Sequence, residues 1–209
     1  MATFCLVHGA WHGGWAWDPL RGELEARGRG VVAPDLPCED PEAGVVEYAA
    51  VVCDGLAGED DAIVVGHSLG GLTIPLVPAR LHVFLCALVP GASQEHAFVP
   101  GFGDARVRDE LGRSYYPDPV DAARELQYPP EMIALASELR RQAPVDAVEA
   151  PLLGPAAYVV CGRDAAIRPD WQRHVTRDVL GIEPIELDAG HSPMLTHVGE
   201  LADVLESLA

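Results

Sequence analysis

The stretch Ala62-Ile63-Val64-Val65-Gly66-His67-Ser68-Leu69-Gly70-Gly71 decides the fold of this chain. Its first four residues are apolar and mostly β-branched, which predicts a short buried strand. Ser68 follows at once, with a glycine two residues before it and another two residues after it. This is the G-x-S-x-G pattern between a strand and a segment that can begin a helix. In that context, the sharp turn lifts the serine hydroxyl clear of the sheet.

The turn at Ser68 requires special backbone geometry. A side chain at Gly66 or Gly70 would collide across the turn, and Ser68 itself is expected in a strained conformation. The next helix would direct its N-terminal amides at whatever reacts there, and Pro75 and Pro78 should keep that helix short or bent. Only partners elsewhere in the chain can distinguish this turn from a glycine-rich turn with an incidental serine.

The rest of the chain alternates strand-like and helix-like segments. Short apolar runs predict strands at 3–7, 30–33, 62–65, 82–89, 156–161 and 182–187. Amphipathic segments with suitable ends predict helices at 18–28, 45–56, 169–180 and 194–208. This alternation predicts an α/β fold with an open, mainly parallel sheet of about six strands that is flanked by helices.

The pattern changes between Pro90 and Pro155. Prolines cluster there, aromatic residues appear, and no run is a convincing strand. Proline-led starts predict two helices, at 118–126 and at 130–141. We therefore expect a single domain over 1–209, which includes a short helical lid inserted at 91–155 after the fourth strand.

The composition limits the classes of partner. The 209 residues are 49% hydrophobic and 22% charged, which is ordinary for a globular domain. The formal net charge of −18 argues against nucleic acid and against an anionic membrane surface, since both need a basic patch. The longest apolar run, 83–89, is too short to span a bilayer, which takes about 20 residues. We expect neither a nucleic-acid partner nor a membrane.

The five cysteines do not predict a disulfide framework or a zinc site. Their number is odd and there is no C-x-x-C pattern. The chain also runs directly into its first strand, without the basic segment that begins a signal peptide. We expect a reducing compartment, the cytoplasm.

A reactive serine needs a neighbouring base, and the base needs a group that orients it. Functional residues of an open parallel sheet gather in the loops after the carboxyl ends of the strands. Asp164 lies in the loop after 156–161, and His191 lies in the loop after 182–187. The order Ser68, Asp164, His191 is the serine–acid–histidine order of the α/β-hydrolases.

Four stretches carry a wider resemblance to that superfamily: His8-Gly9-Ala10-Trp11-His12-Gly13-Gly14-Trp15, Gly66-His67-Ser68-Leu69-Gly70-Gly71, Cys161-Gly162-Arg163-Asp164 and Gly190-His191-Ser192. More narrowly, they resemble the branch that holds plant methyl-ester esterases, hydroxynitrile lyases and many bacterial relatives. The resemblance covers 3–90 and 156–209, and does not extend to the expected lid. With it, we expect the strand order 2-1-3-4-5-6.

The resemblance implies a role for each residue of the constellation. Ser68 would be the nucleophile, His191 the base and Asp164 the acid that holds the imidazole. The backbone amides of Ala10 and Leu69 would form the oxyanion hole. No metal and no cofactor would be needed.

Other polar residues near these motifs have structural alternatives. Trp11 and His12 either line a substrate pocket or only pack their loop. We interpret His8 and His67 as hydrogen-bonded scaffold residues. Asp35 is expected to make a local turn bond.

Two residues compete with the assigned acid and base. Asp188 lies only three residues from His191 and is expected to be structural. His197 is expected on the final helix, whereas His191 lies in a loop.

Gly9 and Ser192 separate the two chemistries of the resembling branch. Hydroxynitrile lyases of this kind carry threonine and lysine at these positions, and without the lysine nothing evident stabilises a departing cyanide. We therefore favour hydrolysis of a carboxylic ester through an acyl-serine intermediate. Acyl transfer or cyclisation in a biosynthetic pathway remains an alternative. So does a ligand-binding protein without turnover, although an intact serine–acid–histidine set argues against it.

Apolar and aromatic residues of the expected lid bear on the substrate: Phe98, Phe102, Tyr115, Tyr116, Tyr128 and Met132. They favour an uncharged, partly aromatic small-molecule ester, unless they only pack the lid on the sheet. The lid is short for this branch. The pocket would therefore be wide and shallow, or completed by a second copy in a homodimer.

Overall fold

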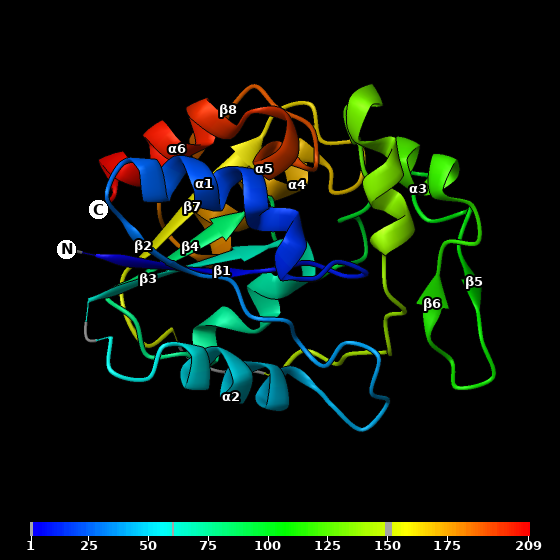
Figure 1. Cartoon of the computed structure of the whole chain (residues 1–209), viewed down its shortest axis with the longest axis horizontal. Coiled ribbons are helices and arrows are strands. Elements are labelled where there is room, and N and C mark those ends of the chain that lie inside the picture. Colours follow the sequence, from blue (N-terminus) through cyan, green and yellow to red (C-terminus); the bar gives the residue numbers. More distant parts are fainter. Residues whose placement is uncertain (1, 60, 149–151) are drawn as a thin grey trace.

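The computed structural model describes residues 2–59, 61–148 and 152–209. Six strands form one sheet in the order β2-β1-β3-β4-β7-β8, and every adjacent pair is parallel (Figure 1). Their bounds are β1 Thr3–Val7, β2 Gly30–Val32, β3 Ala62–His67, β4 Leu81–Leu85, β7 Ala156–Cys161 and β8 Ile185–Leu187. The predicted fold class and strand order are therefore confirmed.

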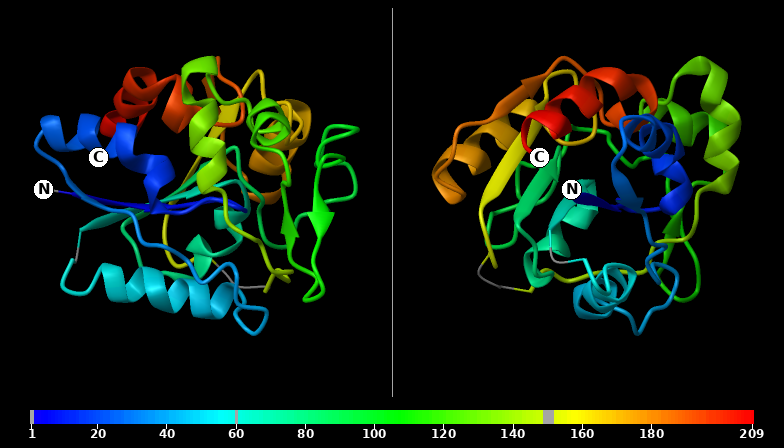
Figure 2. Two further views of the ribbon diagram at one scale, coloured as in Figure 1. Left: turned by 45° about the vertical axis from the view of Figure 1, so that its right-hand side comes forward. Right: turned by 60° about the vertical axis from the view of Figure 1, so that its left-hand side comes forward.

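Helices cover both faces of this sheet (Figure 2). One face packs against α1 (Asp18–Ala26), α5 (Pro193–Thr196) and α6 (Val198–Ser207). The other packs against α2 (Val45–Gly55) and α4 (Pro169–His174). Within the described ranges, no helix has the length and apolar character needed to cross a membrane.

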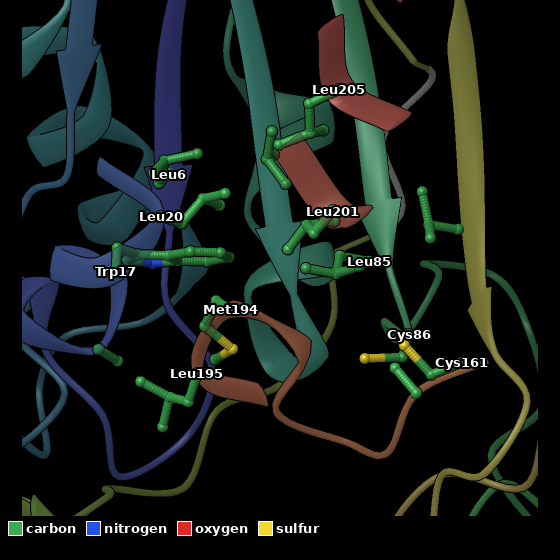
Figure 3. Close-up of a cluster of buried hydrophobic side chains, with 14 of the residues drawn as sticks. Leu6, Trp17, Leu20, Leu85, Cys86, Cys161, Met194, Leu195, Leu201 and Leu205 are labelled. Atoms are coloured by element: carbon green, nitrogen blue, oxygen red, sulfur yellow. The ribbon is translucent and has the colours of Figure 1, made fainter. Parts of the chain in front are cut away.

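The strands divide the core in two because successive side chains of a strand point to opposite faces. Leu6 of β1 joins Trp17 and Leu201 on one face (Figure 3). Its neighbour Cys5 joins Tyr48 on the other face. Burial on both faces explains why the strands appear in the sequence as continuous apolar runs. All five cysteines are free thiols, and four of them are buried.

Several elements are shorter or differently wound than predicted. β4 ends at Leu85 and not at 89, because Cys86 turns the backbone to a φ of 38°. After Ser68 the chain forms two 3₁₀ helices, η2 (Ser68–Leu72) and η3 (Ile74–Leu76), as expected of a helix shortened by prolines. In the part of the chain that the structure describes, no α-helix lies between Ser68 and β4.

The C-terminal half departs from the predictions in a similar way. β8 begins at Ile185 and not at 182. α4 continues as one π-helical stretch, η5 (Val175–Val179). The helix predicted over 194–208 is broken at His197, where φ is −134° and ψ is 48°, so α5 and α6 are separate.

The chain between β4 and β7 lies beyond the carboxyl ends of the central strands (Figure 1). It contains α3 (Pro119–Glu125) and the 3₁₀ helix η4 (Pro130–Glu138), where α-helices were predicted to end at 126 and 141. It also contains an antiparallel pair, β5 (Val107–Arg108) and β6 (Ser114–Tyr115), so the prediction of no strand here was wrong. Two-residue strands are too short to produce a periodic pattern. The range 91–155 expected for the lid includes 149–151, which lie outside the described residues.

Candidate active site

The turn at Ser68 has the strained geometry that its sequence predicts. Ser68 has a φ of 52°, in the left-handed region. A Cβ added at Gly66 would lie 2.9 Å from the Gly70 carbonyl oxygen, and one added at Gly70 would lie 2.8 Å from the His8 carbonyl oxygen. A Cβ at Gly9 would lie 2.9 Å from Ser68 Cβ. These three glycines therefore allow the turn and the β1 loop to approach each other closely.

Ser68, His191 and Asp164 come together from three separate loops. Ser68 Oγ lies 3.1 Å from His191 Nε2, and His191 Nδ1 lies 2.9 Å from Asp164 Oδ2. His191 is 2% exposed and Asp164 is 5% exposed. Because the carboxylate accepts at Nδ1–H, Nε2 is free to accept the serine hydroxyl proton.

The carboxylate of Asp164 is held by donors on both oxygens. Oδ1 accepts from the amides of Ala166 and Ile167 at 2.7 and 2.9 Å. Oδ2 accepts from Gln172 Nε2 at 2.9 Å, and Gln172 Oε1 in turn accepts from the Cys161 amide at 3.0 Å. These donors to both oxygens give the carboxylate a fixed orientation toward His191.

The peptide group between Gly9 and Ala10 is oriented by His8. His8 Nδ1–H donates to the Gly9 carbonyl at 2.9 Å, and His8 Nε2 accepts from the Leu36 amide at 3.0 Å. Burial lowers the pKa of His8 to about 4, which keeps this ring neutral near pH 7. The Gly9 carbonyl belongs to the same peptide group as the Ala10 amide. His8 thereby fixes the direction of that amide.

The Ala10 and Leu69 amides lie with Ser68 on the wall of one cavity of about 420 Å³. Neither amide has an acceptor among the described residues. Phe98 and Phe102 of the chain between β4 and β7 also line this cavity, together with Trp11. A cavity of this size is within the range of small-molecule sites, about 300–1,000 Å³.

A comparison of the chain with protein families gives a match over residues 6–204, to the alpha/beta hydrolase family. The chain belongs to this family. The predicted resemblance is thus confirmed over nearly the whole chain, and the nucleophile turn lies inside the matched region.

Plant methylesterases are among the relatives of this family member. It is 30% identical to salicylic acid-binding protein 2 of Nicotiana tabacum, over 99% of this chain and 96% of that protein. It is 27% identical to methylesterase 3 of Arabidopsis thaliana, over 98% and 94% of the two chains. The first alignment extends over 250 positions, whereas this chain has 209 residues. The tobacco protein therefore has residues within the aligned region that have no counterpart here.

The solved structures give a consistent result. A pyrethroid hydrolase from Sphingobium faniae JZ-2 superimposes with a TM-score of 0.81 at 26% identity, covering 99% of this chain and 97% of that one. Together with the methylesterases, it confirms the prediction of an esterase-type hydrolase.

The two residues with open pocket assignments occupy different places in this hydrolase. Trp11 lines the cavity, with a φ of 64° and its Nε1 donating to Ser114 Oγ at 3.0 Å. His12 is not among the lining residues of that cavity. It is buried, donates through Nδ1 to the Ala10 carbonyl at 2.7 Å and accepts through Nε2 from the Tyr128 hydroxyl at 2.7 Å. Burial lowers its pKa to about 3, so His12 is a neutral link between two loops.

His67 lies behind His191, with ring centroids 4.8 Å apart. Its Nε2 donates to the His191 carbonyl at 2.8 Å, and burial lowers its pKa well below the usual value. Cys86 Sγ contacts the same carbonyl at 3.5 Å. Ligand atoms of His67, Cys86 and His191 lie within 4.8 Å of one another, but their contacts serve the site itself. The expectation of no metal or cofactor stays a prediction.

The residues that competed with the acid and the base lie elsewhere. Asp188 is exposed and pairs with Arg163 at 3.0 Å. His197 lies at the break between α5 and α6 and not on a helix, with Nε2 3.1 Å from an Arg163 nitrogen. Asp35 accepts from the Gly14 amide at 2.7 Å. The predicted local turn bond is thus replaced by a bond that joins the loops after β1 and β2.

Gln127 is a residue of the site that the sequence did not suggest. Its Oε1 accepts from the amides of Ala165 and His191 at 2.7 and 2.9 Å, and its Nε2 donates to the Arg163 carbonyl at 3.0 Å. It has a φ of 56°, and a Cβ at Gly190 would lie 2.8 Å from its Nε2. One side chain just after α3 thus bridges the loops of Asp164 and His191. Nothing in the local pattern of a glutamine after a short helix could have indicated this.

Proposed function

We propose that this chain hydrolyses a carboxylic ester through an acyl-serine intermediate, with Ser68 as nucleophile, His191 as base and Asp164 as orienting acid. The observation that carries the proposal is the hydrogen-bond chain from Ser68 Oγ through the His191 ring to Asp164, at the wall of a cavity. The esterase names of the relatives support the same reaction class.

In the first step, Ser68 Oγ attacks the ester carbonyl carbon while its proton moves to His191 Nε2. The imidazolium that forms lies 2.9 Å from the Asp164 carboxylate, which stabilises the new positive charge. The carbonyl oxygen becomes an oxyanion. It would accept hydrogen bonds from the amides of Ala10 and Leu69, each worth about 10²–10³ in rate.

In the second step, the bond to the alcohol oxygen breaks, and His191 Nε2 gives its proton to the leaving alcohol. Water then enters, loses a proton to His191 and attacks the acyl-serine. Collapse of the second tetrahedral intermediate releases the carboxylic acid and restores the Ser68 hydroxyl. Every proton is carried by the one imidazole, and no cofactor takes part.

The substrate proposed is a small-molecule ester with an apolar or aromatic portion. Trp11, Phe98 and Phe102 offer ring surfaces along the cavity. Of the aromatic residues that suggested such a substrate from the sequence, Tyr116 and Tyr128 pack with the core. The aromatic contact surface is therefore assigned to Phe98 and Phe102.

The test is labelling of Ser68. The purified chain is treated with a serine-directed fluorophosphonate, and its intact mass is compared with that of Ser68→Ala. One adduct in the unmodified chain and none in the variant is the expected result. A panel of 4-nitrophenyl esters of increasing acyl length then measures turnover. An unlabelled Ser68, with no ester of the panel cleaved, would refute the proposal and favour a binding protein.

A further inference from the structure

One wall of the cavity over Ser68 is positively charged. Arg106 and Arg108 both line it; Arg106 comes just before β5, and Arg108 is the second residue of that strand, in the chain between β4 and β7 (Figure 1). The chain as a whole carries a formal charge of −18. Two cations among the lining residues of this cavity are therefore an exception to the charge of the molecule.

Neither arginine forms an ion pair with a carboxylate of the described residues. Across residues 2–59, 61–148 and 152–209, no carboxylate oxygen lies within 4.0 Å of either guanidinium, whereas most other arginines form such pairs: Arg21, Arg27, Arg29, Arg80, Arg113, Arg124, Arg140, Arg141, Arg163, Arg173 and Arg177. Asp146 also lines the cavity and pairs with neither.

The acid that contacts the same loop is already occupied. Glu125 accepts from the amides of Gly103 and Ala105 at 2.8 and 3.1 Å, and from the Tyr116 hydroxyl at 2.9 Å. It is thus used to shape the loop that presents Arg106. This arrangement leaves the charge of Arg106 available to a ligand.

Arg106 is held flat in the cavity wall. Its guanidinium carbon lies 4.6 Å from the Trp11 ring centroid and 5.2 Å from that of Phe102. Its Nε donates to the Gly103 carbonyl at 3.2 Å, and Gly103, with a φ of 89°, has no Cβ to obstruct the guanidinium. Stacking and this bond fix the plane of the group, while the Nη groups have no acceptor among the described residues. A guanidinium with a free outer edge suits bidentate binding of a carboxylate.

The distance from the reacting atoms decides what Arg106 could bind. The Phe102 ring contacts both groups: its centroid lies 5.2 Å from the Arg106 guanidinium carbon and 6.3 Å from the centroid of the His191 ring. Among the described residues, the contacts of Arg106 are with the Gly103 carbonyl and the rings of Trp11 and Phe102, and none is with Ser68, Asp164 or His191. Arg106 suits a charged group at the other end of a substrate.

We propose that Arg106, with Arg108 beside it, binds a carboxylate that the substrate carries away from its scissile ester bond. The substrate class is then a half-ester or a carboxylated aryl ester, and the expectation of an uncharged substrate is replaced. This inference rests on the proposed esterase function. The attraction is local, since it acts within a screening length of about 8 Å at physiological salt, while the net charge of the chain repels anions from further away.

The test uses two substrate pairs that differ only by a carboxylate. Mono-4-nitrophenyl adipate and its methyl ester carry the difference on the acyl side. 4-Acetoxybenzoate and its methyl ester carry it on the alcohol side. The ratio of kcat/KM for the anionic member to that for the neutral member is measured for the unmodified chain, Arg106→Gln and Arg106→Lys. Arg80→Gln is the matched control, since it removes the same charge from a pair with Asp61 outside the cavity.

The unmodified chain should prefer the anionic member of at least one pair. Arg106→Gln should lower that preference by about tenfold, mainly through KM, because the group touches no reacting atom. Arg106→Lys should restore part of it, and Arg80→Gln should leave it unchanged. A ratio that is equal in the unmodified chain and Arg106→Gln overturns the inference while labelling of Ser68 still supports the esterase.

A binding measurement separates failure of the proposed anion site from failure of the proposed esterase function. Monomethyl and dimethyl adipate are titrated into Ser68→Ala and into the double variant with Arg106→Gln, followed by tryptophan fluorescence, to which Trp11 in the cavity wall contributes. Tighter binding of monomethyl adipate, lost in the double variant, supports the anion site even if no ester is cleaved. Equal binding of the two adipates overturns it.

Discussion

The loops at the strand ends and the chain between β4 and β7 contrast sharply. The loops hold a half-buried Ser68 in a hydrogen-bond chain with the buried side chains of His191 and Asp164. The segment between β4 and β7 is wound mostly in short turns and is largely half-buried or exposed. It supplies the charged and aromatic cavity wall. With the proposed function, the contrast teaches that the groups proposed to react are held by loops at the edge of the sheet, while the groups proposed to select the substrate lie on a more exposed segment.

The two regions meet just after α3. Ser192 Oγ donates to the Leu126 carbonyl at 2.6 Å, Gln127 bonds to the loops of the acid and the base, and Tyr128 bonds to His12. These contacts allow the segment to influence the chemistry as well as the substrate. The experiments below test how far that influence reaches.

The largest effect is expected for His191→Ala. Without the base, Ser68 has no acceptor for its proton, and kcat for 4-nitrophenyl acetate should fall by about 10⁴–10⁶-fold. His197→Ala is the control, because the side chain of His197 contacts Arg163 and Thr196 and not the Ser68 hydroxyl, and it should retain turnover within a few-fold. Equal losses in the two variants would show that the wrong histidine has been assigned as base.

Asp164→Asn should come next, with kcat lower by about 10⁴-fold. In place of Oδ1, the new amide nitrogen would face the amide donors of Ala166 and Ile167. In place of Oδ2, it would face Gln172 Nε2 and His191 Nδ1 and favour the wrong tautomer of the histidine. Asp188→Asn, at an exposed ion pair, should change kcat little. Circular dichroism checks that both variants fold. Turnover that survived in Asp164→Asn would move the acid to another residue.

The buried histidines predict a strong dependence of stability on pH. Burial lowers the pKa of His8 to about 4 and that of His12 to about 3, and it lowers the pKa of His67 well below 6.5. Their stabilisation is complete above pH 6.5 and is lost as the pH falls, because only the unfolded chain binds these protons. The free energy of unfolding should fall by about 1.4 kcal/mol per pH unit for each histidine, about 4 kcal/mol for all three.

Urea unfolding at several pH values between 7.5 and 5 measures this slope. His12→Gln should reduce the slope by about one third, whatever its effect on the stability at pH 7.5. A slope that is the same in this variant would show that His12 is protonated in the folded chain. Water would then have more access to the loops at the strand ends than the burial of His12 indicates.

The smallest effect is expected for Gln127→Ala, in which kcat should fall by about tenfold with little change in KM, since about 1.4 kcal/mol corresponds to a factor of ten. The loss follows from loosening the loops that carry Asp164 and His191. Gln127→Glu can still accept from the two amides but cannot donate to the Arg163 carbonyl, so it should be intermediate. An unchanged kcat in Gln127→Ala would confine the segment between β4 and β7 to shaping the cavity.

The parts that could be predicted from the sequence are those set by neighbours along the chain. The strand before Ser68 and the glycines around it follow from side-chain periodicity and steric limits within a few residues. Asp164 and His191 could be located because parallel strands bring their carboxyl ends to one edge. This rule needs only the strand ends, and those were nearly correct even where β4 and β8 proved shorter.

The parts that could not be predicted depend on contacts between distant segments. The break at His197 and the bond from Asp35 to the β1 loop have no local signal. His12 is buried away from the cavity lining, and its Nε2 accepts from the hydroxyl of Tyr128, which lies more than a hundred residues along the chain. The pair β5–β6 is stabilised by two residues on each strand, too few for a pattern.

By itself, then, the sequence determined the six strands and the turn at Ser68, because strand periodicity and the glycine turn act over short distances along the chain. The strand order and the roles proposed for Ser68, Asp164 and His191 followed from the family resemblance. Only the tertiary structure decided that Gln127 joins the loops of Asp164 and His191, and that Arg106 lines the cavity with no carboxylate partner among the residues that the structure describes. A hydrogen bond or an unpaired charge depends on which groups lie within a few ångströms in space, and chain order does not specify that distance.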